Sequence, residues 1–346
     1  MIVVSYVSGH GLGHASRSTE LVAELLRQRD DLRVVIRTSV RTSAFDRLPR
    51  DRVMVEPCET DTGVVQIDSL RPDIEDTARR AAAFYREFDR RVADEADRLR
   101  RSDATLVIGD VPPLAIAAAH HARLPSVVLA NFTWDWIYAY YPEFEPLAPG
   151  VIQTIADAYA RATLALRLPV AGGFDSMAGV VRDIPLIARR STRDRAETRR
   201  LLGIDGARPA VLASFGGYGV DLPYERVEQS GLMVLAPDAP PPGLKYEDLV
   251  AAVDVVVSKP GYGIVSECVA NGTPLLYTSR GRFAEYEVMV AQMPGLLRCR
   301  HITQDDLLAG RWRAGVDSLL AQDDLRDRLR VDGAAVAARA ILAMAG

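Results

Sequence analysis

The sequence predicts an α/β protein of two domains, each built on a doubly wound parallel sheet, and three observations support this. The length of 346 residues is typical of two α/β domains of roughly 150 residues each. Short apolar runs alternate with amphipathic segments, a pattern that favours parallel strands joined by right-handed crossovers. The order of strand, glycine-rich loop and helix occurs at the start of the chain and again after residues 209–215.

The elements of the first half follow one another in a regular order. Residues 2–7 (IVVSYV) predict a strand, and apolar residues at helical spacing within 15–29 predict the helix that follows. Further strands are predicted at 32–37, 53–56, 104–109 and 125–130, a long surface helix over 74–101, a helix at 114–122, and a loop with a short helix over 131–149.

The second half repeats this order after a weakly patterned passage at 168–188, where we expect the chain to cross between domains. Strands are predicted at 209–215, 253–257 and 273–278, a helix after residue 263, and helix over 316–345. The predicted domains are therefore 1–170 and 171–325, with a terminal helix in 326–346 that packs back on the first domain.

Composition excludes several classes of protein. The net charge of −4 argues against a broad basic face for nucleic acid. Three widely spaced cysteines without a CxxC pair argue against a zinc site or a disulfide framework. The amino-terminal apolar run is too short for a signal peptide, and no run is long enough to span a membrane, so we expect a cytoplasmic protein without a metal.

The first candidate site is the loop G-H-G-L-G-H-A-S-R after the first strand. Gly11 and Gly13 would let backbone N–H groups approach an anion at a helix N-terminus. His10 and His14 lie at the same mouth, where a histidine can serve as a general base, and which of the two does so stays open. The alternative is a capping or packing histidine. Arg17, one turn into the helix, could bind a phosphate or lie on the surface.

Two more candidates follow later strands of the first half. Asp110 ends the strand at 104–109 and could orient a histidine as in a His–Asp pair, or could cap the next helix. Trp134 and Asp135 in NFTWDWIY are residue types that contact sugars: the aromatic face of Trp134 suits the apolar C–H groups of a sugar ring, and the carboxylate of Asp135 suits its hydroxyl groups. The alternative for the aromatic residues is packing.

The second half carries two glycine loops at strand ends. Gly216 and Gly217 follow the strand at 209–215 and could hold a diphosphate. The longer string S-K-P-G-Y-G-I-V-S-E supplies further candidates for a nucleotide, with a carboxylate for ribose hydroxyls: Lys259, Gly261, Tyr262, Gly263, Ser266 and Glu267. Glu285, after the next strand, could bind sugar hydroxyls.

Lysine usage draws attention to Lys259. Of the 42 basic residues only Lys245 and Lys259 are lysines. A compact ammonium beside Pro260 and Gly261 can reach a diphosphate where a wide guanidinium fork fits less well. Lys245 lies in a polar stretch with no such neighbours.

Taken together, these strings resemble the GT-B glycosyltransferases. The motif S-K-P-G-Y-G-I-V-S-E is similar to that of the peptidoglycan N-acetylglucosaminyltransferase. The sequence as a whole is more similar still to the glycosyltransferase-like N-terminal region of plant L-arabinokinase. That similarity covers GHGLGHASR, NFTWDWIY, IPLIARR (residues 184–190) and KPGYGIVSE. No kinase phosphate loop is present, so arabinokinase activity is not implied.

The resemblance implies two Rossmann-like domains facing across a cleft, with the acceptor side in 1–170 and the nucleotide-sugar side in 171–325. It implies transfer from a nucleotide-sugar co-substrate, a UDP-sugar first, without metal or cofactor and with inversion. His14 falls on the base histidine, Asp110 near its acidic partner, Glu267 on the ribose-binding glutamate and Glu285 on the donor-sugar acid. His10, Trp134 and Asp135 would contact the acceptor.

Two other functions fit the same sequence features. A nucleotide-sugar 2-epimerase of the same fold would use Asp110, Glu285 and His10 around one sugar and would need no acceptor. A non-catalytic nucleotide-sugar-binding protein would hold the donor without turnover. The sequence predicts neither the acceptor nor the oligomeric state.

Overall fold

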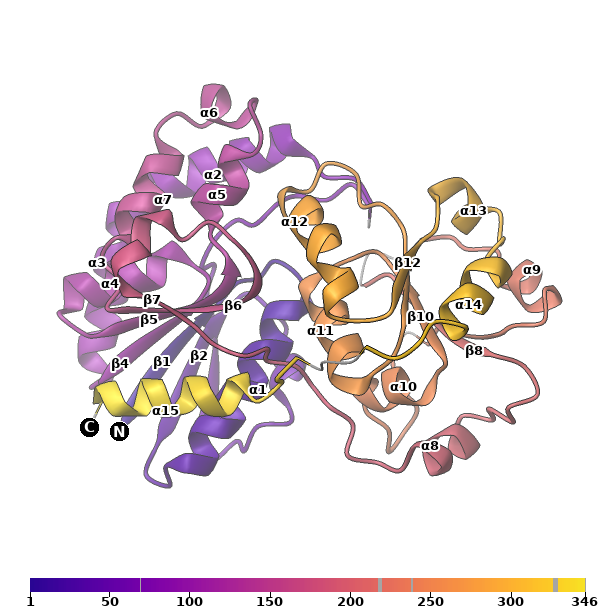
Figure 1. Ribbon diagram of the computed structural model, residues 1–346. Coiled ribbons are helices and arrows are strands. Elements are labelled where there is room, and N and C mark those ends of the chain that lie inside the picture. The colour runs from indigo at the N-terminus through magenta and orange to yellow at the C-terminus, as the bar shows by residue number, and fades with distance from the viewer. Residues whose placement is uncertain (69, 217–219, 238, 326–328, 346) are drawn as a thin grey trace. The chain divides into compact units, whose positions relative to one another are not determined.

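The computed structural model describes residues 1–68, 70–216, 220–237, 239–325 and 329–345 (Figure 1). The chain divides into two compact units. The first comprises residues 1–65, 72–187 and the chain from 330 onward, and the second comprises 66–71 and 188–329. Each unit contains one sheet in which all strand pairs are parallel.

The sheet of the first unit has the strand order β3-β2-β1-β4-β5-β6-β7. Its strands are β1 (Ile2–Val7), β2 (Arg33–Thr38), β3 (Val53–Pro57), β4 (Leu106–Asp110), β5 (Ser126–Phe132), β6 (Leu164–Gly172) and β7 (Val181–Asp183). Its helices are α1 (Leu12–Gln28), α2 (Ile74–Arg86), α3 (Phe88–Arg101), α4 (Pro113–Ala122), α5 (Trp134–Ala139), α6 (Phe144–Leu147), α7 (Val151–Tyr159) and α15 (Gly333–Ala345), with the 3-10 turns η1 (Thr42–Phe45) and η2 (Asp175–Val180).

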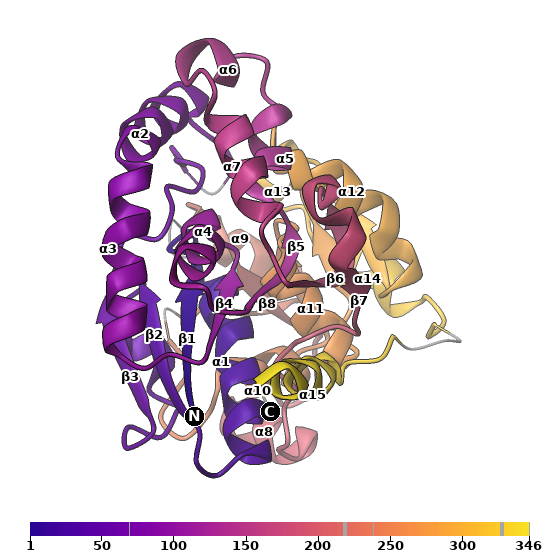
Figure 2. The same cartoon turned by 90° about the vertical axis from the view of Figure 1, so that its left-hand side faces the viewer.

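Helices cover both faces of this sheet. Figures 1 and 2 show α1 and α15 side by side on one face, with α3, α4 and α7 on the other. Leu21 and Leu25 of α1 and Ile341 of α15 are fully or almost fully buried, in one apolar core with Val34 and Ile108 from the strands. Burial of this kind stabilises a domain by about 25 cal/mol for each Å² of apolar surface removed from water. The terminal helix therefore belongs to the first unit.

The sheet of the second unit has the order β12-β11-β10-β8-β9. Its strands are β8 (Ala210–Ser214), β9 (Met233–Leu235), β10 (Val255–Ser258), β11 (Leu275–Tyr277) and β12 (Cys299–His301). Its helices are α8 (Arg195–Leu201), α9 (Tyr224–Gln229), α10 (Tyr246–Ala252), α11 (Tyr262–Asn271), α12 (Ala284–Gln292), α13 (Gln304–Leu308) and α14 (Arg313–Leu320), with the turn η3 (Met293–Gly295). Trp312 and Val316 pack under β10 and β11 in its core.

The structure corrects three sequence predictions. The boundary expected at residue 170 lies at 187/188, because β6 and β7 complete the first sheet. The helix expected over 74–101 is two helices that break at Glu87, whose backbone leaves helical geometry at φ −102° and ψ 13°. The helix expected over 316–345 is likewise two, α14 and α15, separated by a non-helical stretch in the described residues.

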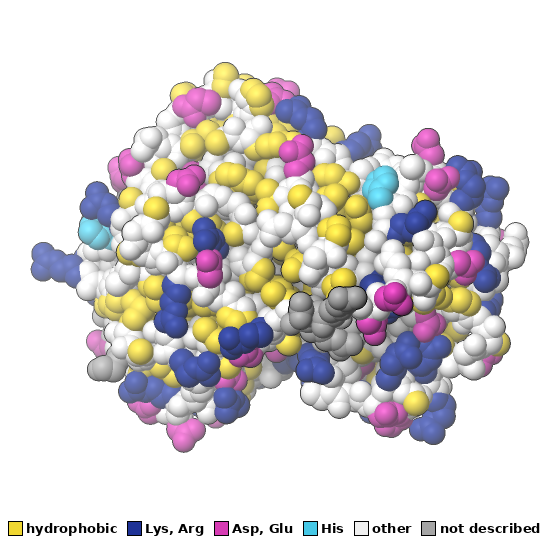
Figure 3. Space-filling view, in the orientation of Figure 1, with side chains coloured by type: hydrophobic (Ala, Val, Ile, Leu, Met, Phe, Trp, Pro, Cys, Tyr) yellow, Lys and Arg dark blue, Asp and Glu magenta, His cyan; other side chains and the backbone are white. Residues whose placement is uncertain are grey.

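Basic and acidic side chains are interspersed on the face shown in Figure 3, and they form no single basic patch there. Many pair along one helix, as Arg79 does with Glu75 and Arg90 with Asp94. In the part of the chain that the structure describes, no helix has the length and apolar character needed to cross a membrane.

Candidate functional site

Strand order directs attention to one edge of the first sheet. β2 and β3 lie on one side of β1, and β4 lies on the other, so the winding reverses between β1 and β4. Loops at the carboxyl ends of two such strands diverge and leave room for a ligand. Val7 ends β1 and pairs in register with Asp110, which ends β4. The loop 8–11 and Asp110 therefore lie together at this switch point.

His14 and Asp110 form a close, buried pair at that point. His14 Nδ1 lies 2.7 Å from Asp110 Oδ1, and their exposed fractions are 6% and 0%. An ionised carboxylate can only accept hydrogen bonds, so His14 Nδ1 donates its hydrogen to Asp110 Oδ1. The lone pair of a neutral His14 is then on Nε2, the atom with which a general base takes a proton.

Arg17 holds both oxygens of the Asp110 carboxylate and lies next to His14. Its Nε donates to Oδ2 at 3.0 Å, its Nη2 donates to Oδ1, and Ser18 Oγ donates to Oδ2 at 2.8 Å. Burial alone would raise the pKa of Asp110, but the charges of Arg17 and His14 and these hydrogen bonds outweigh it and hold that pKa well below its usual range. Asp110 is therefore a carboxylate at neutral pH.

The same contacts correct the prediction that Arg17 binds a phosphate. Its Nη1 donates to Asn131 Oδ1, and Asn131 Nδ2 donates to the carbonyl of Pro169 at 2.7 Å. The Arg17 side chain is only 8% exposed. With Nε, Nη1 and Nη2 all engaged by protein acceptors, the guanidinium is an internal partner of Asp110.

A second buried carboxylate, Asp61, lies in the same region and was missed from the sequence. Ser8 Oγ donates to it at 3.0 Å and Trp134 Nε1 donates at 2.9 Å. Burial raises its pKa, and the charge of Asp110 adds to that rise while hydrogen bonds and His14 oppose it. The sequence around it, ETDTG, offers no pattern that marks one acid for this position.

Trp134 is a packing residue, which corrects its predicted role on the acceptor. Its indole is 1% exposed. The ring stacks on Tyr138 with 5.6 Å between centroids and meets the edge of Phe132 at 5.1 Å. A ring covered in this way has no face left for a sugar.

His10 differs from His14 in its hydrogen bonding. The backbone N–H of Val64 donates to His10 Nδ1 at 3.3 Å, which puts the hydrogen of the neutral ring on Nε2. The ring also meets the edge of Trp134, 5.6 Å between centroids. In the neutral form, His10 therefore carries its hydrogen on Nε2, whereas His14 carries it on Nδ1.

Asp135, the remaining acceptor candidate, is the second residue of α5. Its Oδ1 is buried with no hydrogen-bond partner among the described residues, and burial raises the pKa of the carboxyl group. Because Oδ1 is closed to solvent, an acceptor hydroxyl would have to reach the half-buried Asp135 through its other carboxyl oxygen. The structure thus leaves Asp135 as a candidate and removes Trp134.

The glycines of the first loop have the geometry of a helix start. Gly11 is the N-cap of α1 with φ 82°, a left-handed value that favours glycine, and a Cβ there would meet nothing within 4 Å. Gly13 lies in the first turn. The first turn of α1 contains no acidic side chain, and Gly11 provides no side-chain cap.

The second sheet has its own switch point, between β8 and β10, with β9 on one side and β11 on the other. Ser214 ends β8 and pairs with Ser258, which ends β10. Gly216 follows β8 with φ 73° and open space around its Cβ position. Gly217, predicted beside it, lies outside the described residues. Lys259 directly follows Ser258.

Lys259 carries a largely buried ammonium at this edge. Among the described residues the ammonium makes no hydrogen bond and no ion pair, and only the backbone carbonyl of Lys259 accepts one, from Ser258 Oγ. Burial and, after it, the charge of Arg280 lower the pKa of Lys259 to about 7, against the opposing charges of Glu285 and Asp68. A bound anion would supply the negative charge that this ammonium lacks.

Helix α11 begins next to Lys259. Gly261 is its N-cap, with an extended backbone and no atom within 4 Å of its Cβ position, so packing within the protein does not demand a glycine there. The first turn of α11 contains Tyr262 and Gly263 and no acidic residue, and Ser266 lies in the second. The free N–H groups of such a helix start suit an anion.

Glu267 and Glu285 both have arginine partners in the second unit. Arg189 Nε donates to Glu267 Oε1 at 2.7 Å, and its Nη2 donates to the same oxygen. Arg280 Nη1 donates to Glu285 Oε1 at 2.6 Å. The Arg280 guanidinium also stacks on Phe283, with its Cζ 3.8 Å from the ring centroid. The two glutamates are 3% and 9% exposed. Neither pair was predicted from the sequence, and a donor hydroxyl would have to share each carboxylate with an arginine.

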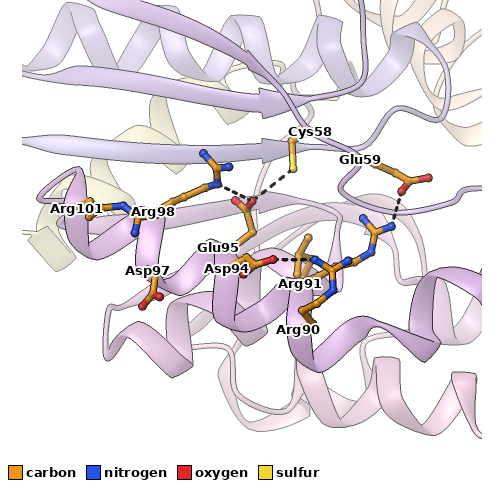
Figure 4. Close-up of a pocket in the computed structure, with 10 residues that line it drawn as sticks. Cys58, Glu59, Arg90, Arg91, Asp94, Glu95, Asp97, Arg98 and Arg101 are labelled. Carbon is orange, nitrogen blue, oxygen red and sulfur yellow. Dashed lines mark hydrogen bonds and ion pairs between the residues drawn. The ribbon is translucent and has the colours of Figure 1, made fainter.

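A pocket of about 440 Å³ lies elsewhere in the first unit, on α3 (Figure 4). Its charged side chains balance: Arg90, Arg91, Arg98 and Arg101 face Glu59, Asp94, Glu95 and Asp97. Burial raises the pKa of Cys58 to about 11, so the thiol in this pocket is unreactive near neutral pH. The pocket contains neither histidine of the first loop. Within the described ranges, no group of three or more His, Cys, Asp or Glu residues is arranged to hold a metal ion.

Comparison with known sequences gives two kinds of relative. No family model matches the chain. The chain is 30% identical over 339 residues to L-arabinokinase of Arabidopsis thaliana, a match that covers 90% of this chain and 31% of that protein. It is 33% identical over 118 residues to a UDP-N-acetylglucosamine--N-acetylmuramyl-(pentapeptide) pyrophosphoryl-undecaprenol N-acetylglucosamine transferase of Clavibacter michiganensis subsp. michiganensis, covering 28% of this chain and 32% of that one. The chain spans about a third of the length of these relatives.

Comparison with solved structures identifies the fold. The calicheamicin glycosyltransferase CalG4 matches with a TM-score of 0.62 at 16% identity, over 99% of this chain and 97% of that one. Medicago truncatula UGT71G1, complexed with UDP-glucose, matches with a TM-score of 0.63 at 10% identity, over 100% and 98%. The predicted GT-B fold is therefore confirmed, as is the resemblance to glycosyltransferases and to L-arabinokinase.

Proposed function

We propose that this protein is a glycosyltransferase that moves a sugar from a nucleoside-diphosphate donor to an acceptor hydroxyl. A UDP-sugar is the first candidate for the donor. The observation that carries the proposal is the buried His14–Asp110 pair, with Nδ1 and Oδ1 2.7 Å apart, at the switch point of the first sheet. The fold and the relatives support it, since the solved neighbours include complexes with UDP-glucose and with thymidine diphosphate.

In this proposal the second unit binds the donor. Lys259 and the N–H groups at the start of α11 would hold the diphosphate, and Glu267 would accept hydrogen bonds from ribose hydroxyls. Negative charge grows on the diphosphate as its bond to the sugar breaks. A fixed ammonium and fixed N–H groups stabilise that charge without a metal, because they need little reorganisation at the moment of reaction.

The first unit would supply the base. His14 Nε2 takes the proton of the acceptor hydroxyl as its oxygen attacks the anomeric carbon. The bond between that carbon and the diphosphate oxygen breaks at the same time, and the nucleoside diphosphate leaves with the electron pair. A single displacement of this kind inverts the anomeric configuration. Asp110 stabilises the imidazolium that forms on His14.

We also propose a reducing, cytoplasmic location, which the three free cysteines support. Burial raises the pKa of Cys268 well above its usual value, and Cys268 is fully buried. Fractionation of the native host cells would test this proposal, and recovery in a secreted fraction would contradict it.

The activity is tested by calorimetry with UDP-, dTDP- and GDP-sugars, followed by mass spectrometry of reactions with a panel of hydroxyl acceptors. We expect saturable donor binding, and a product heavier than the acceptor by one sugar residue, with and without EDTA. Binding without any product would identify a non-catalytic sensor instead. A donor converted to its 2-epimer without an acceptor would identify an epimerase.

A further inference from the structure

The proposed base has a charged neighbour whose place in the reaction the sequence does not indicate. Arg17 lies one helical turn after His14 in α1, and its Nη2 is 3.2 Å from His14 Nδ1. Both of these atoms carry hydrogen when His14 donates to Asp110, so the contact is not a hydrogen bond. It holds a permanent positive charge against the imidazole ring.

Arg17, Asp110 and His14 form a buried cluster, and burial makes a net charge on that cluster costly. Arg17 and Asp110 are 8% and 0% exposed, and together they are neutral. His14, 6% exposed, completes a neutral cluster only when it is itself uncharged. A buried group avoids net charge because desolvation is costly, so this balance favours the form of His14 that can accept a proton.

We propose that Arg17 is a positioning residue for the transfer reaction: it fixes both oxygens of the Asp110 carboxylate beside His14, and its charge offsets that of the carboxylate at the imidazole. This inference rests on the proposed function. The charged and titratable groups described around His14 are Arg17 on the same helix, Asp110 at the end of β4 and Asp61 after β3. Asp61 accepts hydrogen bonds from Ser8 and Trp134, and burial raises its pKa.

The proposal explains why the guanidinium is anchored twice. Nε and Nη2 hold both oxygens of Asp110, and Nη1 is held by Asn131, which is fixed in turn on the carbonyl of Pro169. A planar fork with five N–H groups can make these contacts together, whereas an ammonium cannot. The side chain thus sets the orientation of the carboxylate as well as its charge.

Removal of the charge should move the pH profile. In Arg17→Met the Asp110–His14 pair is left with a net negative charge when His14 is neutral, so the pair takes up a proton at higher pH. We expect the acid limb of kcat/KM to rise by roughly 1–3 pH units, the usual effect of one charge at this distance. Activity should recover in part on the alkaline side.

Arg17→Lys and Arg27→Met complete the kinetic test. Lysine keeps the charge and loses the fork, so its acid limb should move less than that of Arg17→Met. Arg27 is an exposed arginine on the same helix that pairs with Glu24, and its substitution should move nothing. An equal loss of activity at every pH in both Arg17 variants would show that the residue only supports packing and would overturn the proposal.

A second readout needs no turnover and separates this proposal from the proposed function. The chain has five histidines, so NMR of protein labelled with 15N-histidine, with His14→Ala to assign the signal, follows the titration of His14 directly. We expect the titration to move to higher pH in Arg17→Met, and less in Arg17→Lys. An unchanged titration overturns the role of Arg17 whether or not the protein transfers sugar. If Arg17→Met does not fold, the titration of His14 in Arg17→Lys is compared with that in wild type, and an unchanged titration overturns the role of Arg17.

Discussion

Each unit has a parallel sheet with a switch point in its strand order, and the charged side chains at the two switch points differ in their partners. At the edge of the first sheet, Asp110 is hydrogen-bonded by His14, Arg17 and Ser18. At the edge of the second, Lys259 is largely buried and has no partner among the described residues. A proton-transfer group needs a fixed orientation, whereas an anion site needs positive charge that the protein has not already neutralised. The contrast therefore fits the proposal that the first unit supplies the base and the second binds the donor.

The largest effect, on stability, is expected from a substitution at the first switch point, where Asp110 is hydrogen-bonded by protein side chains. Asp110→Asn removes the charge that Arg17 and His14 share, which leaves a buried guanidinium without its counter-ion. We expect a loss of about 3–5 kcal/mol in the free energy of unfolding, measured by urea denaturation at pH 7. Asp97→Asn, which removes an exposed pair with Arg100, should cost under ~1 kcal/mol.

The pH dependence of that stability has a definite sign. The pKa of Asp110 is lowered in the folded protein, so its contribution is present above the unfolded carboxyl pKa of about 4 and is lost as pH falls below it. We therefore expect the difference in stability between proteins with and without Asp110→Asn, both measured in a His14→Ala background so that the neighbouring imidazole does not titrate, to be constant from pH 6 to 8. A difference that shrinks over this neutral range would contradict an ionised Asp110.

Lys259→Met tests the second switch point, where the ammonium of Lys259 has no partner among the described residues. We expect donor affinity to fall about 10- to 100-fold, because a charge-assisted hydrogen bond contributes roughly 1.5–3 kcal/mol. Lys245→Met is the matched control, since Lys245 is the other lysine and is exposed. Calorimetry with the UDP-sugar measures both. Equal affinities for Lys259→Met and wild type would remove Lys259 from the diphosphate site.

The same lysine predicts a pH dependence of binding. The pKa of Lys259 is lowered to about 7, chiefly by burial, and a diphosphate binds the protonated form. Donor affinity should therefore fall as pH rises above 7, and binding at pH 7.5 should take up protons. Binding enthalpies in HEPES and Tris, which differ in ionisation enthalpy, should differ for wild type and agree for Lys259→Met.

Glu267→Gln should have a smaller effect that depends on the nucleotide. The ribose of UDP has a 2′-hydroxyl that the deoxyribose of dTDP lacks, so the carboxylate can act on one more group in UDP. We expect UDP to bind about tenfold more weakly to the variant, as after loss of one charged hydrogen bond, and dTDP to be affected less. Glu228→Gln, on the exposed face of α9, is the control. Equal losses for both nucleotides would place Glu267 away from the 2′-hydroxyl.

The smallest effect on transfer is expected from Trp134→Phe. Its indole is buried and donates to Asp61, so the substitution should lower stability by about 1–3 kcal/mol through an unsatisfied buried carboxyl group. The KM for the acceptor should not change. A raised acceptor KM at unchanged stability would restore the sugar-contact role that the sequence predicted.

The buried strands were predictable because parallel strands covered on both faces are continuous apolar runs, as at 2–7 and 255–258. β6 and β7 were not, because β6 alternates buried and half-buried residues and contains Pro169, and β7 is three residues long. The break between α2 and α3 at Glu87 also has no glycine or proline to announce it. Its position depends on packing against neighbouring helices.

The His14–Asp110 contact was predictable because both residues follow strands that a doubly wound sheet brings side by side. The partners of Arg17, Glu267 and Glu285 were not. A charged side chain of this length can reach several partners, and only the folded chain selects one. Residue type alone therefore suggested phosphate or sugar ligands where the structure shows arginine–carboxylate pairs.

The most direct test of the central claim separates rate from affinity in His14→Ala. We expect kcat/KM for transfer to fall about 10²- to 10⁴-fold, the usual contribution of a general base, while the donor Kd measured by calorimetry stays at the wild-type value. His121→Ala, an exposed histidine at the end of α4, should match wild type in both. Transfer at the wild-type rate in His14→Ala, or a donor Kd that rises in step with the loss of rate, would contradict the account.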